Sequence, residues 1–303
     1  MKQKIKVGGM ALSNGVMMRS SHFIAIAIRT PYGIRVFSRP LKSLKLRYKF
    51  LGFPFIRGFV ILIEVILLAF SSYRLASKIR KKPKLKLKEK IKSASNLFWS
   101  IFYLLLIVGI FQLISLKIYE VEIFRKVPIL FNLSTSFLLI VFFFTLILIF
   151  FQTPQNVKLF SYHGAEHKVI NAYEKDSLLE SHSVKNFSRL HPRCGSILAA
   201  LTLFLSSFFL IFLPQNLFFP IYFLFVILIF SLSFSFSFEL ILVMLKFKDS
   251  LIGKIFFLPL LGFQALFTRE PTSDQIKVAI AALKEVLKRE ELLTKGGKNG
   301  KRD

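Results

Sequence analysis

Four long apolar runs limit what this chain can fold into more than any other feature of its sequence. They cover residues 97–116, 129–151, 196–213 and 219–245. A run of about 18 or more apolar residues is long enough to cross the hydrocarbon core of a bilayer as a helix. The composition agrees, because 54% of the residues are hydrophobic and the mean hydropathy is +0.58. We therefore predict an all-α integral membrane protein with four transmembrane helices.

A fifth apolar segment, residues 53–70, is shorter and contains Arg57 and Glu64. Charges at membrane depth are costly, so we interpret this segment as a re-entrant or interfacial helix. Glu64 and a second carboxylate, Glu239 near the end of the fourth run, have two interpretations. They either line a functional polar cavity, with Glu239 reaching the site described below, or form ion pairs with Arg57 and Lys246.

The basic residues predict an orientation. If residues 53–70 do not cross, four spans leave 39 Lys and Arg residues on one side and 3 on the other. Because cytoplasmic loops are enriched in Lys and Arg, both termini are expected in the cytoplasm. The Lys-rich tract of residues 71–96 is expected to lie on anionic lipid headgroups. This explains the formal net charge of +27 more simply than nucleic-acid binding does.

The ends of the chain have signals of their own. Residues 22–38 alternate weakly about a Pro-Tyr-Gly turn and predict a β-hairpin, preceded by a glycine-containing loop at Gly8, Gly9 and Gly15. Near the C-terminus, Thr272 and Gln275 form a capping box. The helix that follows has an apolar stripe of Ile276, Ala279, Ile280, Leu283 and Leu287.

These signals divide the chain into four regions. The first is a cytoplasmic N-terminal segment with the hairpin, and the second combines the interfacial helix with the basic linker. The third is the transmembrane region, which includes a polar cytoplasmic segment at residues 152–195. The fourth has amphipathic helices and a disordered Gly/Lys-rich tail from residue 295. The regions cover residues 1–52, 53–96, 97–254 and 255–303.

The polar segment contains the residues that can do chemistry. His163 and His167 lie four residues apart, on one face of a helix expected over residues 157–173. Two imidazoles at that spacing can chelate one transition metal. Their order, His-x-x-Glu-His, is the inverted zincin pattern, in which the glutamate takes a proton from water at the metal. Glu166 is therefore the candidate general base.

A second polar run, residues 191–195, brings His191, Arg193 and the single cysteine, Cys194. Three of the five histidines and this cysteine thus fall within one short stretch. His191 or Cys194 is the preferred further ligand, with Glu174 and Glu239 as alternatives. A cysteine ligand favours zinc among divalent metals.

Two side chains near these ligands are candidates for binding substrate. Arg193 is expected to bind an anionic group of the substrate. Asn171 continues the histidine face of the helix and is a second substrate-binding candidate.

Two functions from different classes fit this pattern. The preferred one is a metal-dependent hydrolase at the cytoplasmic membrane surface, of unknown substrate. The alternative is a non-enzymatic membrane protein, such as a transporter, insertase-like factor or scaffold, with a structural metal or none. Three protein ligands and an open position favour the enzyme, and four protein ligands favour the alternative. Homo-oligomerisation is left open.

The sequence resembles the YqhQ-like family of bacterial polytopic membrane proteins along nearly its whole length. The resemblance implies residence in the bacterial inner membrane and a metal-dependent activity on an unknown substrate. In the N-terminal loop, Met10 and Asn14 stand where the family typically has Gln and Glu, which implies an altered site if those residues contribute to it. The matching positions are residues 162–174, 191–196, 8–9, 15–18, 57–58, Glu64, Glu239, 270–272 and 274–275.

Overall fold

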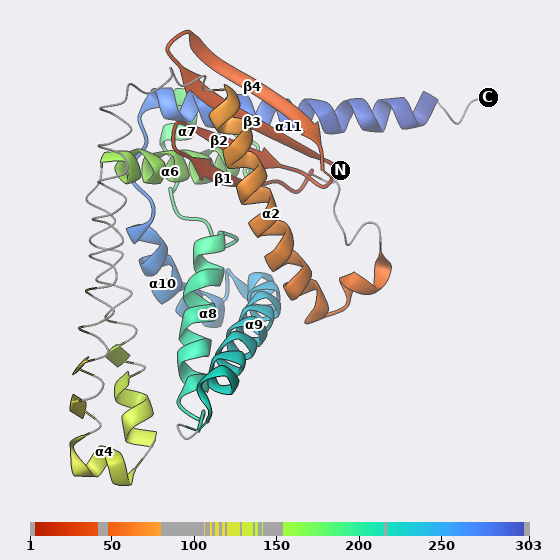
Figure 1. Ribbon diagram of the computed structural model, residues 1–303. Coiled ribbons are helices and arrows are strands. Elements are labelled where there is room, and N and C mark those ends of the chain that lie inside the picture. Colours follow the sequence, from red (N-terminus) through yellow and green to blue (C-terminus); the bar gives the residue numbers. More distant parts are fainter. Residues whose placement is uncertain are drawn as a thin grey trace. The chain divides into compact units, whose positions relative to one another are not determined.

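A computed structural model of the protein describes most of the chain outside the first two predicted spans (Figure 1). It divides into two compact units, one of residues 1–80, 152–200 and 234–303, the other of residues 81–151 and 201–233. Most of the predicted spans at 97–116 and 129–151, and the linker beyond residue 79, lie outside the described residues. The described residues are 4–41, 48–79, 106, 110, 113–114, 117–118, 120–127, 129–135, 137–138, 141, 154–214 and 217–299.

The N-terminal segment is a four-stranded antiparallel sheet in the order β1-β2-β3-β4. The predicted hairpin is present as β3 (Phe23–Thr30) and β4 (Gly33–Pro40), paired from Thr30↔Gly33 outward. The predicted glycine-containing loop is wrong, because these residues form a second hairpin of β1 (Gly8–Leu12) and β2 (Gly15–Arg19). The chain is therefore mostly helical with a sheet, and not all-α.

Both faces of this sheet are covered. One face, with Val16, Met18, Ala25 and Ala27, packs against helices α6 (Pro154–Glu174) and α11 (Ser273–Asn299). We call it the site face. The opposite face packs against α2 (Ile56–Ile79) through side chains that include Met17, Ile24, Ile26 and Ile28. We call it the α2 face.

The helix predicted over residues 157–173 is α6, and the C-terminal helix is α11. The capping box is confirmed: the Thr272 amide donates to Gln275 Oε1 at 2.8 Å, and the Gln275 amide donates to Thr272 Oγ1 at 3.3 Å. The predicted stripe of α11 lies against the sheet and α6, with Leu287 partly buried. Residues 295–299, where a disordered tail was predicted, continue this helix.

Helix α2 is longer than the predicted interfacial segment, because it continues through residues that had been assigned to the basic linker. Leu68, Leu75 and Ala76 pack on the sheet, which explains why the helix extends past residue 70. Among the described residues, two helices are long and apolar enough to cross a membrane by length and composition, Ile56–Ala76 and Pro220–Phe247. The second of these coincides with the predicted fourth run and with α9 (Phe219–Met244).

The remaining helices are shorter. Two of them are apolar and 16 residues long, and the first coincides with the predicted third run. Asn132 donates to the carbonyls of Ile211 and Leu213 within the second unit. The two apolar helices are α8 (Gly195–Leu210) and α10 (Leu251–Leu266), and the others are α4 (Glu122–Lys126), α7 (Ser181–Lys185), η1 (Lys49–Gly52) and η2 (Leu245–Phe247).

Candidate metal centre

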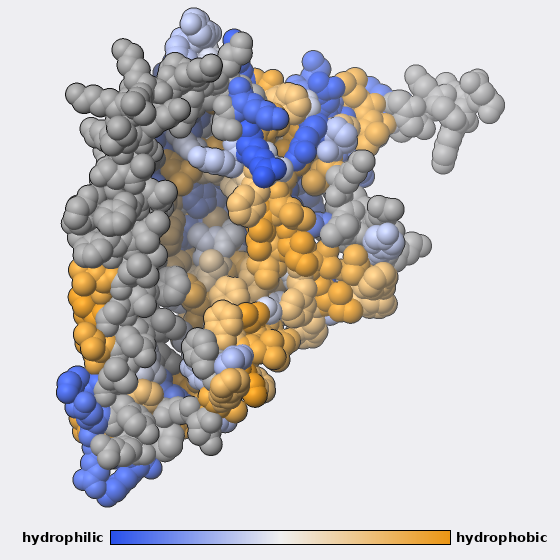
Figure 2. Space-filling model, viewed as in Figure 1, coloured by the Kyte–Doolittle hydropathy of each residue, from blue (hydrophilic) through white to orange (hydrophobic). Residues whose placement is uncertain are grey.

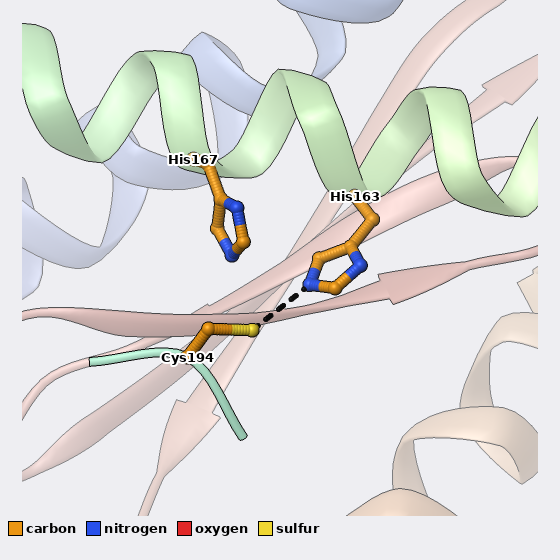
Figure 3. Close-up of side chains that lie close together, drawn as sticks. All are labelled: His163, His167 and Cys194. Carbon is orange, nitrogen blue, oxygen red and sulfur yellow. Dashed lines mark hydrogen bonds between the residues drawn. The ribbon is translucent and has the colours of Figure 1, made fainter. Parts of the chain in front are cut away.

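Three of the predicted ligands converge in the first unit. His163 and His167 project from one face of α6 toward Cys194, which immediately precedes α8 (Figure 3). Their potential ligand atoms all lie within 4.8 Å of one another. The Nε2 atom of His163 is 3.2 Å from the Cys194 Sγ, and the two imidazole centroids are 4.4 Å apart. This group can hold a metal ion.

Both histidines are oriented by main-chain carbonyls. His163 Nδ1 donates to the Phe267 carbonyl at 2.8 Å, and His167 Nδ1 donates to the Arg189 carbonyl at 2.7 Å. A proton on each Nδ1 directs each Nε2 toward the cysteine. Metal-binding histidines commonly have this second-shell bond, which fixes the ring and its tautomer. The arrangement therefore has the supporting contacts of a metal site as well as its ligand types.

The segments that supply these carbonyls are themselves fixed. The Arg189 guanidinium donates to the Thr268 carbonyl, which joins the two segments. The fully buried Gln264 of α10 accepts from the His191 amide at 2.9 Å and donates to the His191 carbonyl at 3.1 Å. Asn171 donates to the carbonyls of Ser188 and Leu190, so its side-chain amide holds this loop. Its role in binding substrate stays a prediction.

Glu166 lies beside the three ligands and is 4% exposed. Its Oε2 atom is buried and has no hydrogen-bond partner among the described residues. Its other oxygen faces β1 so closely that a Cβ on Gly9 would be 2.6 Å away. Burial raises the pKa of Glu166 to about 7, although the charges on His167 and His163 oppose this rise. A carboxylate in this condition can exchange a proton near neutral pH.

Cys194 and His163 shift each other's pKa. Burial raises the pKa of Cys194, but the hydrogen bonds from His163 and His167 outweigh it and hold that pKa well below the usual range. Burial also lowers the pKa of His163, whereas the contact with Cys194 and the charge on Glu166 raise it to about 9. Cys194 is therefore favoured as the thiolate, which is the form that binds metals.

His191 is a neighbour of this group and not a member of it. Its Nε2 is 3.4 Å from Glu174 Oε2, and its Nδ1 accepts from the Arg193 amide at 3.3 Å. Both ring nitrogens are thus engaged, and the prediction of His191 as a ligand is not supported. Burial lowers the pKa of His191 to about 4, so its ring is neutral. Glu174 also forms an ion pair with the Arg193 guanidinium and is not a member of the three-ligand group. The binding of a substrate anion by Arg193 stays a prediction.

The remaining predicted residues lie away from the centre. Arg57 Nε donates to Glu239 Oε1 at 2.7 Å, and the Phe55 amide donates to the same oxygen at 3.2 Å. Glu239 therefore pairs α9 with α2, and the predictions that it reaches the metal or pairs with Lys246 are wrong. Glu64 faces the α2 side of the sheet, where its charge acts on Arg19.

Met10 and Asn14, the two residues that differ from the family pattern, also lie away from the three-ligand group. Met10 packs among the side chains of the α2 face, opposite to the face on which Gly9 meets Glu166. Asn14 lies in the β1–β2 turn, where its carbonyl accepts from the Arg29 amide at 2.8 Å. Neither residue contributes to the three-ligand group, so the implied alteration of that group is not seen.

Sequence reasoning did not assign a role in the site to three residues that shape it. Gly9 leaves room for the Glu166 carboxylate, and Gly164 lets α6 approach the chain after α10, because a Cβ there would be 2.1 Å from the Arg269 carbonyl. Gln264 had a visible signal, since it is a polar residue inside an apolar helix. The glycines stood out only as part of a predicted loop and of the matching family positions, because the neighbours that explain them come from distant parts of the chain.

Comparisons with known proteins agree with the resemblance seen in the sequence. A family described as "Protein of unknown function (DUF1385)" matches residues 53–289. The "Uncharacterized protein YqhQ" of Bacillus subtilis (strain 168) is 31% identical over 307 aligned residues, which cover 94% of this chain and 93% of that protein. No solved structure matches the chain.

Proposed function

The chain belongs to the DUF1385 family of proteins of unknown function, and we propose that it is a zinc-dependent hydrolase at the cytoplasmic face of a bacterial membrane. One observation carries this proposal. Two oriented histidines and a cysteine converge beside a buried carboxylate whose second oxygen has no partner among the described residues. Burying a carboxylate oxygen without a partner costs free energy of folding. A cluster that only stabilised the fold would not need this carboxylate.

The donor set fits zinc. His163, His167 and Cys194 supply two nitrogen atoms and one sulfur atom, a combination that favours zinc over harder divalent ions. Zinc sites with three protein ligands keep a fourth position open and are typically catalytic. Zinc bound there would lower the pKa of a water molecule to near 7 and polarise a substrate carbonyl or phosphoryl group.

The chain's own residues supply the proton transfer. Glu166 is held against Gly9 and is surrounded by the three ligands' charges, so its carboxylate stays within the site. Its Oε2 atom has no hydrogen-bond partner among the described residues, so it can accept a proton from the attacking water and return it to the leaving group. The Phe267 and Arg189 carbonyls keep both imidazoles fixed while this happens.

The packing of α2 supports the cytoplasmic placement. Leu68, Leu75 and Ala76 hold the second half of this helix against the sheet, so at most residues 56–67 can enter a hydrocarbon core, and one side of that stretch packs on α9 at Gly58. Twelve helical residues span about 18 Å, well short of the roughly 30 Å of a hydrocarbon core. We therefore place α2 at the membrane interface, as the sequence predicts, with α9 as a crossing helix and the metal centre on the side rich in Lys and Arg.

Metal content tests the centre directly. We expect about one zinc per chain in the detergent-purified protein by elemental mass spectrometry, and a loss of roughly tenfold or more in His167→Ala. His182→Ala is the matched control, because His182 is exposed on α7 and outside the cluster, and it should keep its zinc. Equal zinc in the two variants, or none in the wild type purified without chelator, would refute the proposal.

Cobalt substitution distinguishes the enzyme from a scaffold. An open coordination position will let added thiocyanate change the visible spectrum of the cobalt protein, whereas a shell of four protein ligands will not respond. Glu166→Gln should keep the metal but hydrolyse generic esters or phosphodiesters about 10²–10⁴-fold more slowly than the wild type. A closed shell, or full activity in Glu166→Gln, would support a non-enzymatic role or a different base.

A further inference from the structure

A cavity of about 950 Å³ lies between α2 and the α2 face of the sheet, away from the metal centre. Its lining combines charged side chains with large apolar ones. The charged members are Arg19, Arg39, Arg74 and Glu64, and the others are Ile24, Pro40, Leu41, Leu67, Leu68, Phe70 and Ser71.

The arginines are placed there by regular structure. Strand register puts Arg19 of β2 and Arg39 of β4 on either side of Ile24 of β3, so all three lie in one row on the same face. On α2, Glu64, Ser71 and Arg74 recur at helical spacing and face this row. The two arginines of the sheet and the polar side chains of α2 thus face one another at the place where the apolar packing between the sheet and α2 ends.

The charges in this lining are unequal. Three guanidiniums accompany one carboxylate, and arginine stays charged in proteins. Arg39 Nη2 donates to Ser71 Oγ at 2.8 Å, which aims its guanidinium along the cavity wall. Burial lowers the pKa of Arg19, and only the charge on Glu64 opposes that effect. A partly buried arginine of this kind is stabilised by an anion that can accept two of its hydrogen bonds.

The mouth of the cavity is apolar and faces outward. Leu67 is 60% exposed and Phe70 is 68% exposed, both on the flank of α2 that we place at the membrane interface. Figure 2 shows this flank as a hydrophobic surface, with hydrophilic side chains gathered over β4 and the end of α2 beside the sheet. A ligand that fits such a cavity has an anionic head and an apolar tail.

We propose that this cavity binds an anionic phospholipid, with the headgroup phosphate held by Arg19, Arg39 and Arg74 and an acyl chain lying against Leu67 and Phe70. Basic pockets beside membrane helices on the cytoplasmic side bind phosphate headgroups in this way. The inference rests on the membrane placement proposed above and does not depend on the metal centre.

The test uses the full chain purified in detergent and native mass spectrometry with added phosphatidylglycerol or phosphatidylcholine. We expect the wild type to retain one phosphatidylglycerol and Arg39→Gln to retain it about tenfold less, since a charge-assisted phosphate contact is lost. Arg35→Gln is the matched control, because Arg35 lies on the same strand and face, is also exposed, and does not line the cavity. Equal loss in the two variants would overturn the proposal.

Further experiments test the contributions of the headgroup, the acyl chain and the membrane placement separately. Equal retention of phosphatidylcholine would show that the anionic headgroup is not recognised, and would overturn the proposal. If soluble glycerol phosphate displaces the lipid at equal concentration, the acyl chain makes no contribution, which also overturns it. Arg74→Gln repeats the test from α2 in case Arg39→Gln unfolds. Carbonate extraction of membranes tests the membrane placement by itself, so its failure is distinguishable from failure of the cavity.

Discussion

Met17 and Met18 are consecutive residues of β2, and both are almost fully buried, yet they belong to different parts of the molecule. Met18 packs with α6 and α11 on the site face, and Met17 packs with α2 on the opposite face. The same separation recurs on β4, where Ser38 bonds to α11 and Arg39 bonds to α2.

The two faces differ in how completely they are filled. The site face meets small side chains and glycines, so that α6 and the metal centre lie close to the backbone of the sheet. The α2 face has larger side chains and ends in a charged cavity. One strand can thus contribute to the proposed metal site and to the proposed lipid cavity without conflict, because alternate residues point to opposite faces.

We expect the largest effect from a substitution at the point where α6 comes close to the chain that follows α10. Gly164→Ala places a Cβ 2.1 Å from the Arg269 carbonyl, so the backbone that positions Phe267 must move. We expect a loss of about 3 kcal/mol or more in stability together with loss of zinc, measured by thermal unfolding and elemental analysis. Gly262→Ala is the control, because nothing lies near a Cβ there, and it should keep its zinc and not lose stability.

The next test compares the two methionines. Met17→Ala and Met18→Ala should each cost about 2–4 kcal/mol, because each leaves a buried cavity. Only Met18→Ala should also weaken zinc binding, measured by competition with a chromogenic chelator, since only Met18 packs on the side of α6. Equal zinc affinity in the two variants would contradict the separation of the site face from the α2 face.

Consecutive glycines of β1 give a finer comparison. A Cβ at Gly9 would meet the Glu166 carboxylate, whereas one at Gly8 would make only an ordinary contact 3.8 Å from Arg19. Gly9→Ala should keep its zinc but hydrolyse substrate roughly tenfold or more slowly, because Glu166 is displaced from the metal side. Gly8→Ala should match the wild type in both zinc content and rate, and a slow Gly8→Ala would contradict this assignment.

The smallest effect concerns the bond that holds α11 to β4. The Ser38 hydroxyl and Arg289 lower the pKa of Glu285, so its contribution to stability is present above the unfolded pKa of about 4.5 and is lost as pH falls through the lower folded value. Ser38→Ala should therefore cost about 1 kcal/mol at pH 7. The difference from wild type should shrink below pH 4 in thermal unfolding, and a constant difference would exclude this linkage.

Local signals predicted the parts of the fold that depend on neighbours in sequence. The helix around His163 and His167, the capping box at Thr272 and the stripe of α11 all follow from spacing within a few residues. The first hairpin was missed because glycine and methionine are weak strand signals. The extension of α2 was missed because its polar residues resemble a linker until the sheet covers them.

The site was predicted in part for the same reason. The two histidines and Cys194 were identified by residue type and proximity in sequence, and the structure brings them together. Spacing could not show that the His191 ring is engaged by Glu174 and the Arg193 amide, nor that Arg57 pairs with Glu239 across a separation of 182 residues. Those partners depend on tertiary contacts that no short pattern encodes.

The two carbonyls that orient the histidines also set an order of events in biosynthesis. His163 and His167 leave the ribosome long before Phe267, which lies near the end of the 303-residue chain. A nascent protein with α6 already folded still lacks the contact that aims the His163 ring. The complete set of oriented side chains therefore exists only after α8, α9 and α10 have been made, and the proposed metal binding belongs to a late stage of maturation.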